Sequence, residues 1–184
     1  MPHPFPVRAP FAIVPSMSMM QSATSFLASP RDCDLFPAAA GKADAFWPAL
    51  AHLEASYPGF GAWYWSKVVP GLDNATRQIL HVGDVENPAA IAIVKRDNIE
   101  AKICTLWVSE TCRGKGVGGE LMAEAIDWIG HAHPLFTVPA ERYEEFRPLM
   151  ARFRFEETMR IPSLYRSGVV EHVYNGQLLP TLVS

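Results

Sequence analysis

Three extended runs follow one another closely in the middle of this chain and lead into a glycine-rich loop. Apolar and β-branched residues dominate 77–82, 89–95 and 101–108, and short polar turns such as Asp97-Asn98 separate them. Strands joined by connections this short pair antiparallel. The sequence therefore predicts a three-stranded meander that ends at the glycine-rich loop.

Helical patterns flank this meander on both sides. Apolar residues at helical spacing predict helices over 42–56 and 63–69, the second ending at Pro70-Gly71. An amphipathic helix follows the loop up to Gly130, and its crossover makes the next strand parallel to the last strand of the meander. The other expected elements are strands at 34–36, 135–138, 155–160 and 169–174, and a helix over 141–153 kinked at Pro148. This order predicts an α+β fold with a central mixed, mostly antiparallel sheet flanked by helices.

The first 30 residues differ in composition from the rest of the chain. Six of the 16 prolines lie there, and Pro15 interrupts the apolar run at 10–14, which argues against a cleaved signal peptide. We expect residues 1–30 to be a proline-rich, flexible tail. Residues 31–184 are then expected to form a single domain, since a chain of 184 residues is typical of one domain.

Composition and charge exclude several classes of function. Hydrophobic residues make up 49% of the chain, which is typical of a globular protein. The net charge is -3, so the overall charge does not favour binding to nucleic acid or to an anionic membrane. No apolar run reaches about 18 residues. Three cysteines without a CxxC pair predict a reducing compartment, the cytoplasm, and no structural zinc. His131 and His133 lack partner ligands, so no metal is expected.

The glycine-rich stretch Arg113–Gly119 is the most informative motif. Glycines let a ligand approach the backbone, and the free N–H groups of a helix start attract anions, so a phosphate is the expected ligand. Gly114, Gly116 and Gly119 also satisfy GxGxxG. A dinucleotide fold is disfavoured, because residues 109–113 intervene after a strand that belongs to a meander. Alternatively, the glycine-rich loop binds no ligand and only turns the chain.

Arg113 to Gly118 resembles the Q/R-x-x-G-x-G/A motif of the GNAT superfamily of N-acetyltransferases. The strand 103–108 and the helix after the loop lie where the family has them, and the resemblance extends over roughly 32–174. It implies a GNAT-like acyl-CoA N-acyltransferase fold with acetyl-CoA as cosubstrate. It also implies direct transfer of an acetyl group to a primary amine of a small molecule or protein.

The resemblance further implies which residues bind the cosubstrate. Backbone N–H groups from Arg113 to Gly118 would bind the pyrophosphate, and Val108 with its neighbours would bind the pantetheine arm. The implied residues are Trp107, Val108, Arg113, Gly114, Lys115, Gly116, Val117, Gly118 and Gly119.

A general base is useful because the attacking amine must be neutral. Glu100 lies 13 residues before Arg113, which matches the general-base glutamate of family members that resemble histone acetyltransferases. Lys102 lies two residues on, on the same strand face, and a cation there would lower the pKa of Glu100 and weaken it as a base. Glu100 is our candidate, and the reserve carboxylates are Asp84, Glu86 and Glu171.

The general acid of the family is missing from its usual position. Counting from the pair Arg154-Phe155, which is Gly-Phe in the family, the tyrosine position falls on Met150. The substitutes are Tyr143, which we select, Tyr165 and Tyr174. This departure leaves open an alternative function, a non-catalytic sensor of CoA or acyl-CoA on the same fold.

Aromatic residues gather where the family has its acceptor groove: Tyr57, Phe60, Trp63, Tyr64 and Trp65. We expect most of them in the core and one or two in the groove, facing a cationic or an apolar acceptor. Cys104 and Cys112 lie near the implied thioester. The sequence shows no Cys-His arrangement, so direct transfer is favoured over an acyl-cysteine. A homodimer is compatible with the sequence.

Overall fold

The structure is a computed structural model that describes residues 35–37 and 43–178. These residues lie within one compact unit, Cys33–Ser184. The predicted tail over 1–30 lies outside the described residues. None of the described helices is long and apolar enough to cross a membrane.

The predicted meander forms most of the first sheet. Its four strands lie in the order β1-β2-β3-β4, and every neighbouring pair is antiparallel. The strands are β1 (Leu35–Pro37), β2 (Arg77–Gly83), β3 (Pro88–Arg96) and β4 (Ala101–Val108). The meander prediction is therefore confirmed, and β4 has the predicted bounds.

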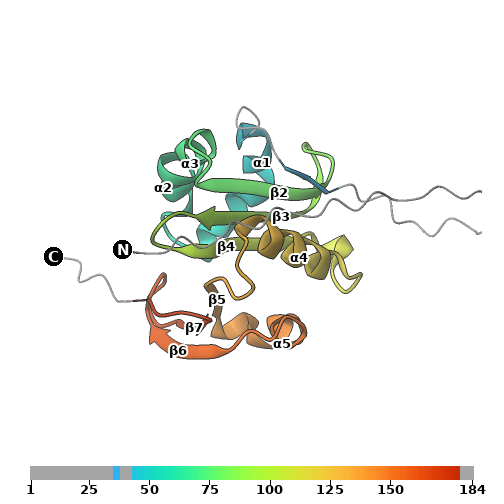
Figure 1. The fold of residues 1–184 in the computed structure, drawn as a ribbon. Coiled ribbons are helices and arrows are strands. Elements are labelled where there is room, and N and C mark those ends of the chain that lie inside the picture. The colour runs from blue at the N-terminus through green and yellow to red at the C-terminus, as the bar shows by residue number, and fades with distance from the viewer. Residues whose placement is uncertain (1–34, 38–42, 179–184) are drawn as a thin grey trace, which may run out of the picture. The chain divides into compact units, whose positions relative to one another are not determined.

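Both faces of this sheet are buried, as the alternation along β3 shows. Ala90, Ala92 and Val94 contribute to one hydrophobic cluster, and Ile91 and Ile93 contribute to another on the opposite face. Helix α4 (Val117–Ile129) covers the first face, and the helices that precede β2 cover the second (Figure 1).

The helices before β2 are more continuous than the sequence predicts. They are α1 (Ala43–Leu50), a 3-10 segment (Ala51–Ala55), α2 (Phe60–Trp63), a π-helical segment (Tyr64–Val68) and α3 (Val69–Asp73). The predicted end at Pro70-Gly71 is wrong. Val69 begins a new helical turn, so Pro70 lies in the first turn, where its missing N–H group removes no helical hydrogen bond.

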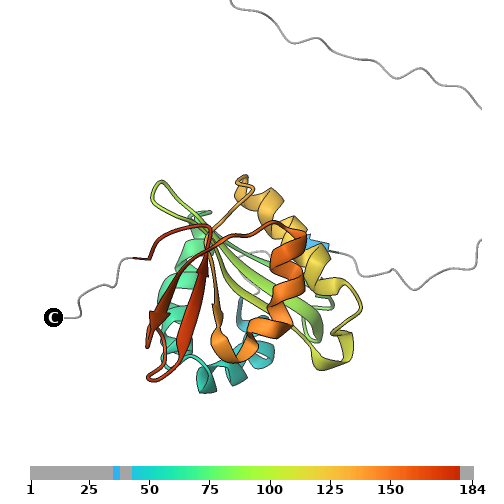
Figure 2. The ribbon, with the colours of Figure 1, turned by 90° about the horizontal axis from the view of Figure 1, so that it is seen from below.

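A second, smaller sheet follows α4. Its strand order is β5-β7-β6, with antiparallel neighbours. The elements are β5 (Phe136–Pro139), α5 (Tyr143–Arg152), β6 (Glu157–Pro162) and β7 (Val170–Tyr174), with a 3-10 turn (Ala140–Arg142) before α5. Figure 2 shows α4 and α5 together on one side of the strands, with α1 to α3 on the other.

The two sheets meet through a short parallel contact between β4 and the residue that precedes β5. Ile103 donates its backbone N–H to Leu135 O at 3.0 Å, and Leu135 donates to Ala101 O at 2.9 Å. In the described part of the chain, Lys102–Leu135 is the one bridge between the two sheets. The predicted parallel pair therefore exists only at its start, and the strands diverge beyond it.

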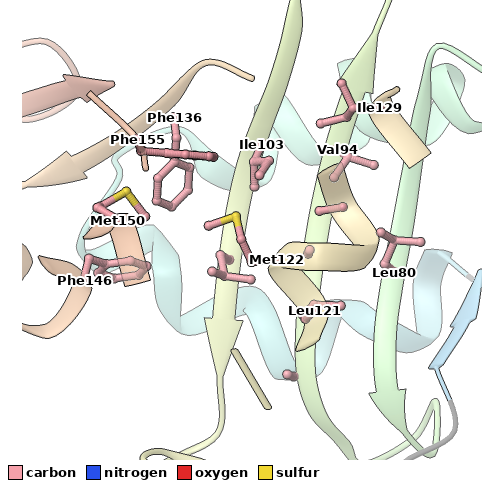
Figure 3. Close-up of a cluster of buried hydrophobic side chains, with 14 of the residues drawn as sticks. Leu80, Val94, Ile103, Leu121, Met122, Ile129, Phe136, Phe146, Met150 and Phe155 are labelled. Carbon is pink, nitrogen blue, oxygen red and sulfur yellow. The ribbon is translucent and has the colours of Figure 1, made fainter. Parts of the chain in front are cut away.

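One hydrophobic cluster nevertheless joins both sheets. It contains Ile103 of β4, Met122 of α4, Phe136 of β5 and Met150 of α5, which Figure 3 shows close together. Met150, at the position where the family has a tyrosine, is only 3% exposed. This position therefore serves packing, and it supplies no acidic proton.

Candidate active site

A bulge in β4 shapes the edge that faces the gap between the sheets. Ile93 pairs with Thr105 and Val94 pairs with Ile103, which leaves Cys104 as an extra residue on β4. A bulge bends its strand and increases the local twist. It thereby accounts for the divergence of β4 from β5.

The divergence leaves backbone donors on β4 without a partner strand. Ser109 donates its N–H to Ala89 O of β3 at 2.9 Å. Because N–H directions alternate along a strand, those of Val108 and Leu106 point away from β3, towards the gap. Trp107 is directed the other way: it pairs with Ile91, and its ring lies 5.9 Å from that of His52. Of the two β4 residues implied for the cosubstrate, Val108 is therefore the better placed.

The glycine-rich loop forms an open helix start beside this edge. Gly114 and Gly116 have φ of 73° and 90°, a region that favours glycine. Gly116 is the N-cap of α4, and no hydrogen bond from a side chain caps the helix. The N–H groups of Val117 and Gly118 are the first of α4, and such groups have no intrahelical acceptor, so they are available to an anion.

Three basic residues lie around this helix start, and one of them was not predicted. Arg113 and Lys115 are exposed, and Arg113 Nε donates to Val108 O at 3.3 Å. Arg152, at the end of α5, lies so close to Gly119 that a Cβ atom there would be 2.5 Å from Arg152 Nη1. No local motif marks Arg152, since it comes from a later helix. Its only sequence signal is a basic residue in a last helical turn.

A cavity of about 320 Å³ opens between the diverging strands. On one side it is lined by β4 and β5 residues such as Leu106 and Phe136. On the other side it is lined by aromatic side chains of the segment between α1 and α3 and of the β6–β7 connection. Its wall therefore includes the open edge of β4 and reaches the region expected to bind the acceptor.

Three of the five clustered aromatic residues line this cavity, one more than expected: Tyr57, Phe60 and Trp63. Tyr64 belongs to the core instead. It is fully buried, and its hydroxyl donates to Ala43 O at 2.8 Å. Trp65 is 41% exposed. The aromatic segment thus both packs the fold and forms a wall of the cavity.

Glu100, the predicted general base, lines the cavity at the turn between β3 and β4. Its carboxylate accepts a hydrogen bond from Lys95 Nζ at 2.9 Å, and Asp97 binds the same ammonium at 3.0 Å. The cation paired with Glu100 is therefore Lys95, and the Lys102 named by the sequence is not its partner. The role of Glu100 as a base stays a prediction.

Glu171 is the reserve carboxylate with the most unusual surroundings. It lies on β7, is 2% exposed, and its Oε2 has no hydrogen-bond partner among the described residues. Burial, with a smaller contribution from Glu141, raises its pKa to about 7, against the opposing effects of Arg166 and Lys102. Burial raises the pKa of Tyr57, and the charge of Glu171 raises it further. Asp84 and Glu86, by contrast, are exposed at the β2–β3 turn.

The tyrosine selected as the general acid is not at the cavity. Tyr143 begins α5, and its ring packs 4.6 Å from the ring of His172 on β7. Tyr174 is 4% exposed in the shared core. Tyr165 does line the cavity, and its hydroxyl accepts a hydrogen bond from Lys102 Nζ at 3.2 Å. Tyr165, and not Tyr143, therefore reaches the cavity wall, because the β6–β7 connection carries it there. The identity of the general acid stays a prediction.

The two described cysteines differ in their chemistry. Burial raises the pKa of Cys104, so its thiol stays protonated at neutral pH and is a poor nucleophile. Hydrogen bonds from Ser109 and Thr111 lower the pKa of Cys112, which lies just before the glycine-rich loop. Within residues 35–37 and 43–178, no group of three His, Cys, Asp or Glu residues could hold a metal ion.

Comparison with known proteins supports the fold described above. The acetyltransferase (GNAT) family model matches residues 47–138, half of the chain. An acetyltransferase of the GNAT family from Streptococcus pneumoniae superposes with a TM-score of 0.60 at 13% identity, covering 78% of this chain and 97% of that one. The yncA protein from Salmonella typhimurium, solved with its cofactor acetyl-CoA, gives 0.55 at 13% identity, covering 81% and 98%.

A curated relative of another kind matches part of the chain. Transketolase 1 from Vibrio parahaemolyticus is 33% identical over 97 residues, which is 47% of this chain. The chain spans only 13% of the length of that relative.

Proposed function

Because the chain belongs to the acetyltransferase (GNAT) family, we propose that it transfers an acetyl group from acetyl-CoA to a primary amine. The amine attacks the thioester carbonyl directly, without an acyl-enzyme intermediate. The protonated thiol of Cys104 supports direct attack, since an acyl-cysteine route needs a thiolate.

In this proposal acetyl-CoA lies along the open edge of β4. The N–H groups of Leu106 and Val108 bind the pantetheine arm, and the pyrophosphate binds at Val117 and Gly118. The observation that carries the proposal is this juxtaposition: an uncapped helix start with two left-handed glycines lies one short loop after a strand edge that has no partner among the described residues. Arg113, Lys115 and Arg152 supply positive charge beside the phosphates.

The chemistry forms one bond and breaks another. The amine nitrogen bonds to the carbonyl carbon, its proton passes to a base, and the C–S bond breaks to release CoA as a thiolate that takes up a proton. Glu100 is the proposed base, and Tyr165 is the proposed donor to the thiolate. Alignment of amine and thioester supplies about 7–11 kcal/mol, whereas acid–base help supplies about 3–5 kcal/mol. Positioning by β4 and the loop therefore contributes most of the rate.

The first experiment is a thermal melt with and without acetyl-CoA. At 100 times Kd the ligand stabilises the fold by about 2.7 kcal/mol, a shift of roughly 2–4 °C at this size. We expect Gly118→Glu to abolish the shift, because its carboxylate repels the pyrophosphate while it suits the first turn of a helix. Gly118→Ala is the matched control for folding, since a Cβ there would only reach ordinary contact with Val108 Cγ2 at 3.4 Å.

If millimolar acetyl-CoA leaves the melting temperature of the wild type unchanged, the loop only turns the chain and the proposed function is wrong. A shift retained in Gly118→Glu would place the ligand elsewhere.

The base is tested by kinetics on Glu100→Gln. We expect kcat/KM to fall roughly 10²- to 10⁴-fold near neutral pH and to recover in part at high pH, where the amine is already neutral. Glu124→Gln, which removes an exposed carboxylate on α4, serves as control. Rates unchanged across pH would exclude Glu100, and Glu171→Gln is then the variant to assay for the same loss.

The alternative function is a sensor that binds CoA or acyl-CoA without turnover. Met150 in place of the family tyrosine is the observation that favours it. The sensor predicts a melting shift with acetyl-CoA but neither CoA release nor an acetylated product with any amine tested.

A further inference from the structure

Two cations on the cavity wall lack a carboxylate partner among the described residues. Arg77 and Lys102 both line the cavity, and neither forms an ion pair within 4.0 Å in the described part of the chain. The other two cations of the wall are neutralised. Lys95 binds Asp97 and Glu100 at 3.0 and 2.9 Å, and Arg142 binds Glu145 at 2.9 and 2.7 Å.

Arg77 is held in place by its surroundings and leaves most of its donors unused. Its guanidinium lies 5.6 Å from the centre of the Trp63 ring, and its Nη1 donates to Cys104 Sγ at 3.4 Å. Its stem packs on Gly71, where a Cβ would lie 2.6 Å from Arg77 Cδ. A guanidinium has five N–H donors, so a thiol satisfies only a small part of its capacity.

Lys102 is also fixed and also charged. Its Nζ donates to the Tyr165 hydroxyl at 3.2 Å and lies 5.9 Å from the centre of that ring. Burial lowers the pKa of Lys102, but the neighbouring Tyr165, Cys104 and Glu100 outweigh it and leave the pKa above its ordinary value. An ammonium has three donors, of which Tyr165 takes one.

The two cations face the same part of the cavity. Lys102 and Cys104 are two residues apart on the same face of β4, roughly 7 Å along the strand, and Arg77 reaches Cys104 from β2. Among the described residues neither nearby carboxylate forms an ion pair with Arg77 or Lys102: Glu100 is bound to Lys95, and Glu171 interacts with Lys102 only at longer range. Partly buried cations of this kind need an anionic partner, and the wall does not provide it.

We propose that the acceptor amine carries a carboxylate, which Arg77 and Lys102 bind while the aromatic wall contacts the rest of the molecule. The acceptor class is then a free amino acid or another small aminocarboxylate. This inference rests on the proposed function and names its substrate class. It disfavours polyamines, because two unpaired cations repel a second ammonium group.

The phosphates of CoA are not the anion that we propose for Arg77 and Lys102. They are proposed to bind at the start of α4, and Lys102 lies six residues before the end of β4, which is roughly 20 Å along the strand. The carboxylate site and the phosphate site are therefore at opposite ends of β4.

The test compares amino acids with their matched amides, which keep the amine and lose the negative charge. Thermal melts are recorded with α-, β- and γ-amino acids, aminobenzoates and their amides, both with CoA and without it. We expect the melting temperature to rise with at least one acid. Its amide should bind roughly 10- to 100-fold more weakly, because charge-assisted hydrogen bonds are lost.

Variants connect this preference to the two cations. Arg77→Gln and Lys102→Gln keep most of the side-chain stem. We expect each variant to raise the Kd and the KM of the amino acid roughly 10-fold or more, while binding of the amide stays unchanged. Arg96→Gln is the matched control, since Arg96 also lies over a tryptophan, at 4.5 Å from the Trp128 ring, but outside the cavity lining.

Equal binding of acids and amides, or acid binding retained in the Arg77→Gln, Lys102→Gln double variant, would overturn the inference. So would a shift with acetyl-CoA but with no member of the panel. Failure of the proposed function gives another result, because acetyl-CoA itself then leaves the melting temperature unchanged. The melts recorded without CoA still decide whether a carboxylate binds.

Discussion

At the scale of single residues, the burial of Glu171 makes the stability of the fold depend on pH. Burial raises its pKa to about 7 in the folded protein, whereas a glutamate in an unfolded chain titrates near 4.3. Because the folded pKa is the higher one, the stability that this group contributes is fully present below about pH 4. It is lost progressively as the pH rises through 7.

Glu171→Gln should therefore change the pH dependence of stability. The amide cannot ionise, so only the wild type loses this contribution as the pH rises. We therefore expect the free energy of unfolding of the variant, relative to that of the wild type, to be about 2–3 kcal/mol higher at pH 8 than at pH 5. Urea unfolding at the two pH values measures this difference. Glu124→Gln, at an exposed position, should show no such change. A difference between wild type and Glu171→Gln that is the same at both pH values would show that Glu171 titrates normally.

At the scale of elements, the end of α5 meets the start of α4. The contact between Arg152 and Gly119 brings a third cation to the helix start that we propose for the pyrophosphate. The N–H groups there are fixed by the backbone, but the charge beside them depends on how two helices pack. The proposed binding of the cosubstrate thus depends on a pair of elements, α4 and α5.

Arg152→Gln should weaken acetyl-CoA binding about 5- to 10-fold, since one partly exposed charge-assisted contact contributes about 1 kcal/mol. Titration calorimetry at low and moderate salt measures this, and the wild type should show the steeper salt dependence. The control is Arg147→Gln on the same helix, whose partner is Glu144 at 2.8 Å. If wild type and Arg152→Gln bind acetyl-CoA with equal affinity, Arg152 of α5 does not contribute to the proposed phosphate site.

At the scale of the whole folded unit, two sheets depend on one core. The Lys102–Leu135 bridge is short, but the cluster drawn in Figure 3 contains side chains from both sheets. Within it, the ring centres of Phe136 and Phe146 lie 5.7 Å apart. We therefore expect the two sheets to unfold together.

Phe136→Ala tests this cooperativity, because all five tryptophans precede β5 and report on the first sheet and its helices. Loss of a buried Phe costs about 3–5 kcal/mol. Tryptophan fluorescence and circular dichroism should show the same lowered midpoint. Ile99→Ala, at a 93% exposed position, should leave both unchanged. A midpoint that falls by circular dichroism but not by fluorescence would mean that the sheets unfold separately.

Much of this architecture could be predicted, because it follows local patterns. The period-two runs of β2 to β4 and the apolar stripe of α4 depend on residues two to four positions apart, and the glycine-rich loop is one short motif. The two predictions that failed did so at local irregularities of the backbone. The helix through Pro70 continues because Val69 starts a new turn, and the β4–β5 pairing stops because Cys104 forms a bulge.

The sequence by itself therefore determined the order of the elements, the antiparallel meander, the glycine-rich loop and the family. Only the tertiary structure decided that Tyr165 and not Tyr143 reaches the cavity, and that Arg152 lies beside the glycine-rich loop. It also buries Glu171 with an oxygen that has no hydrogen-bond partner among the described residues. The physical reason is range. Secondary structure and backbone motifs depend on neighbours along the chain, whereas burial, charge pairing and pKa depend on neighbours in space.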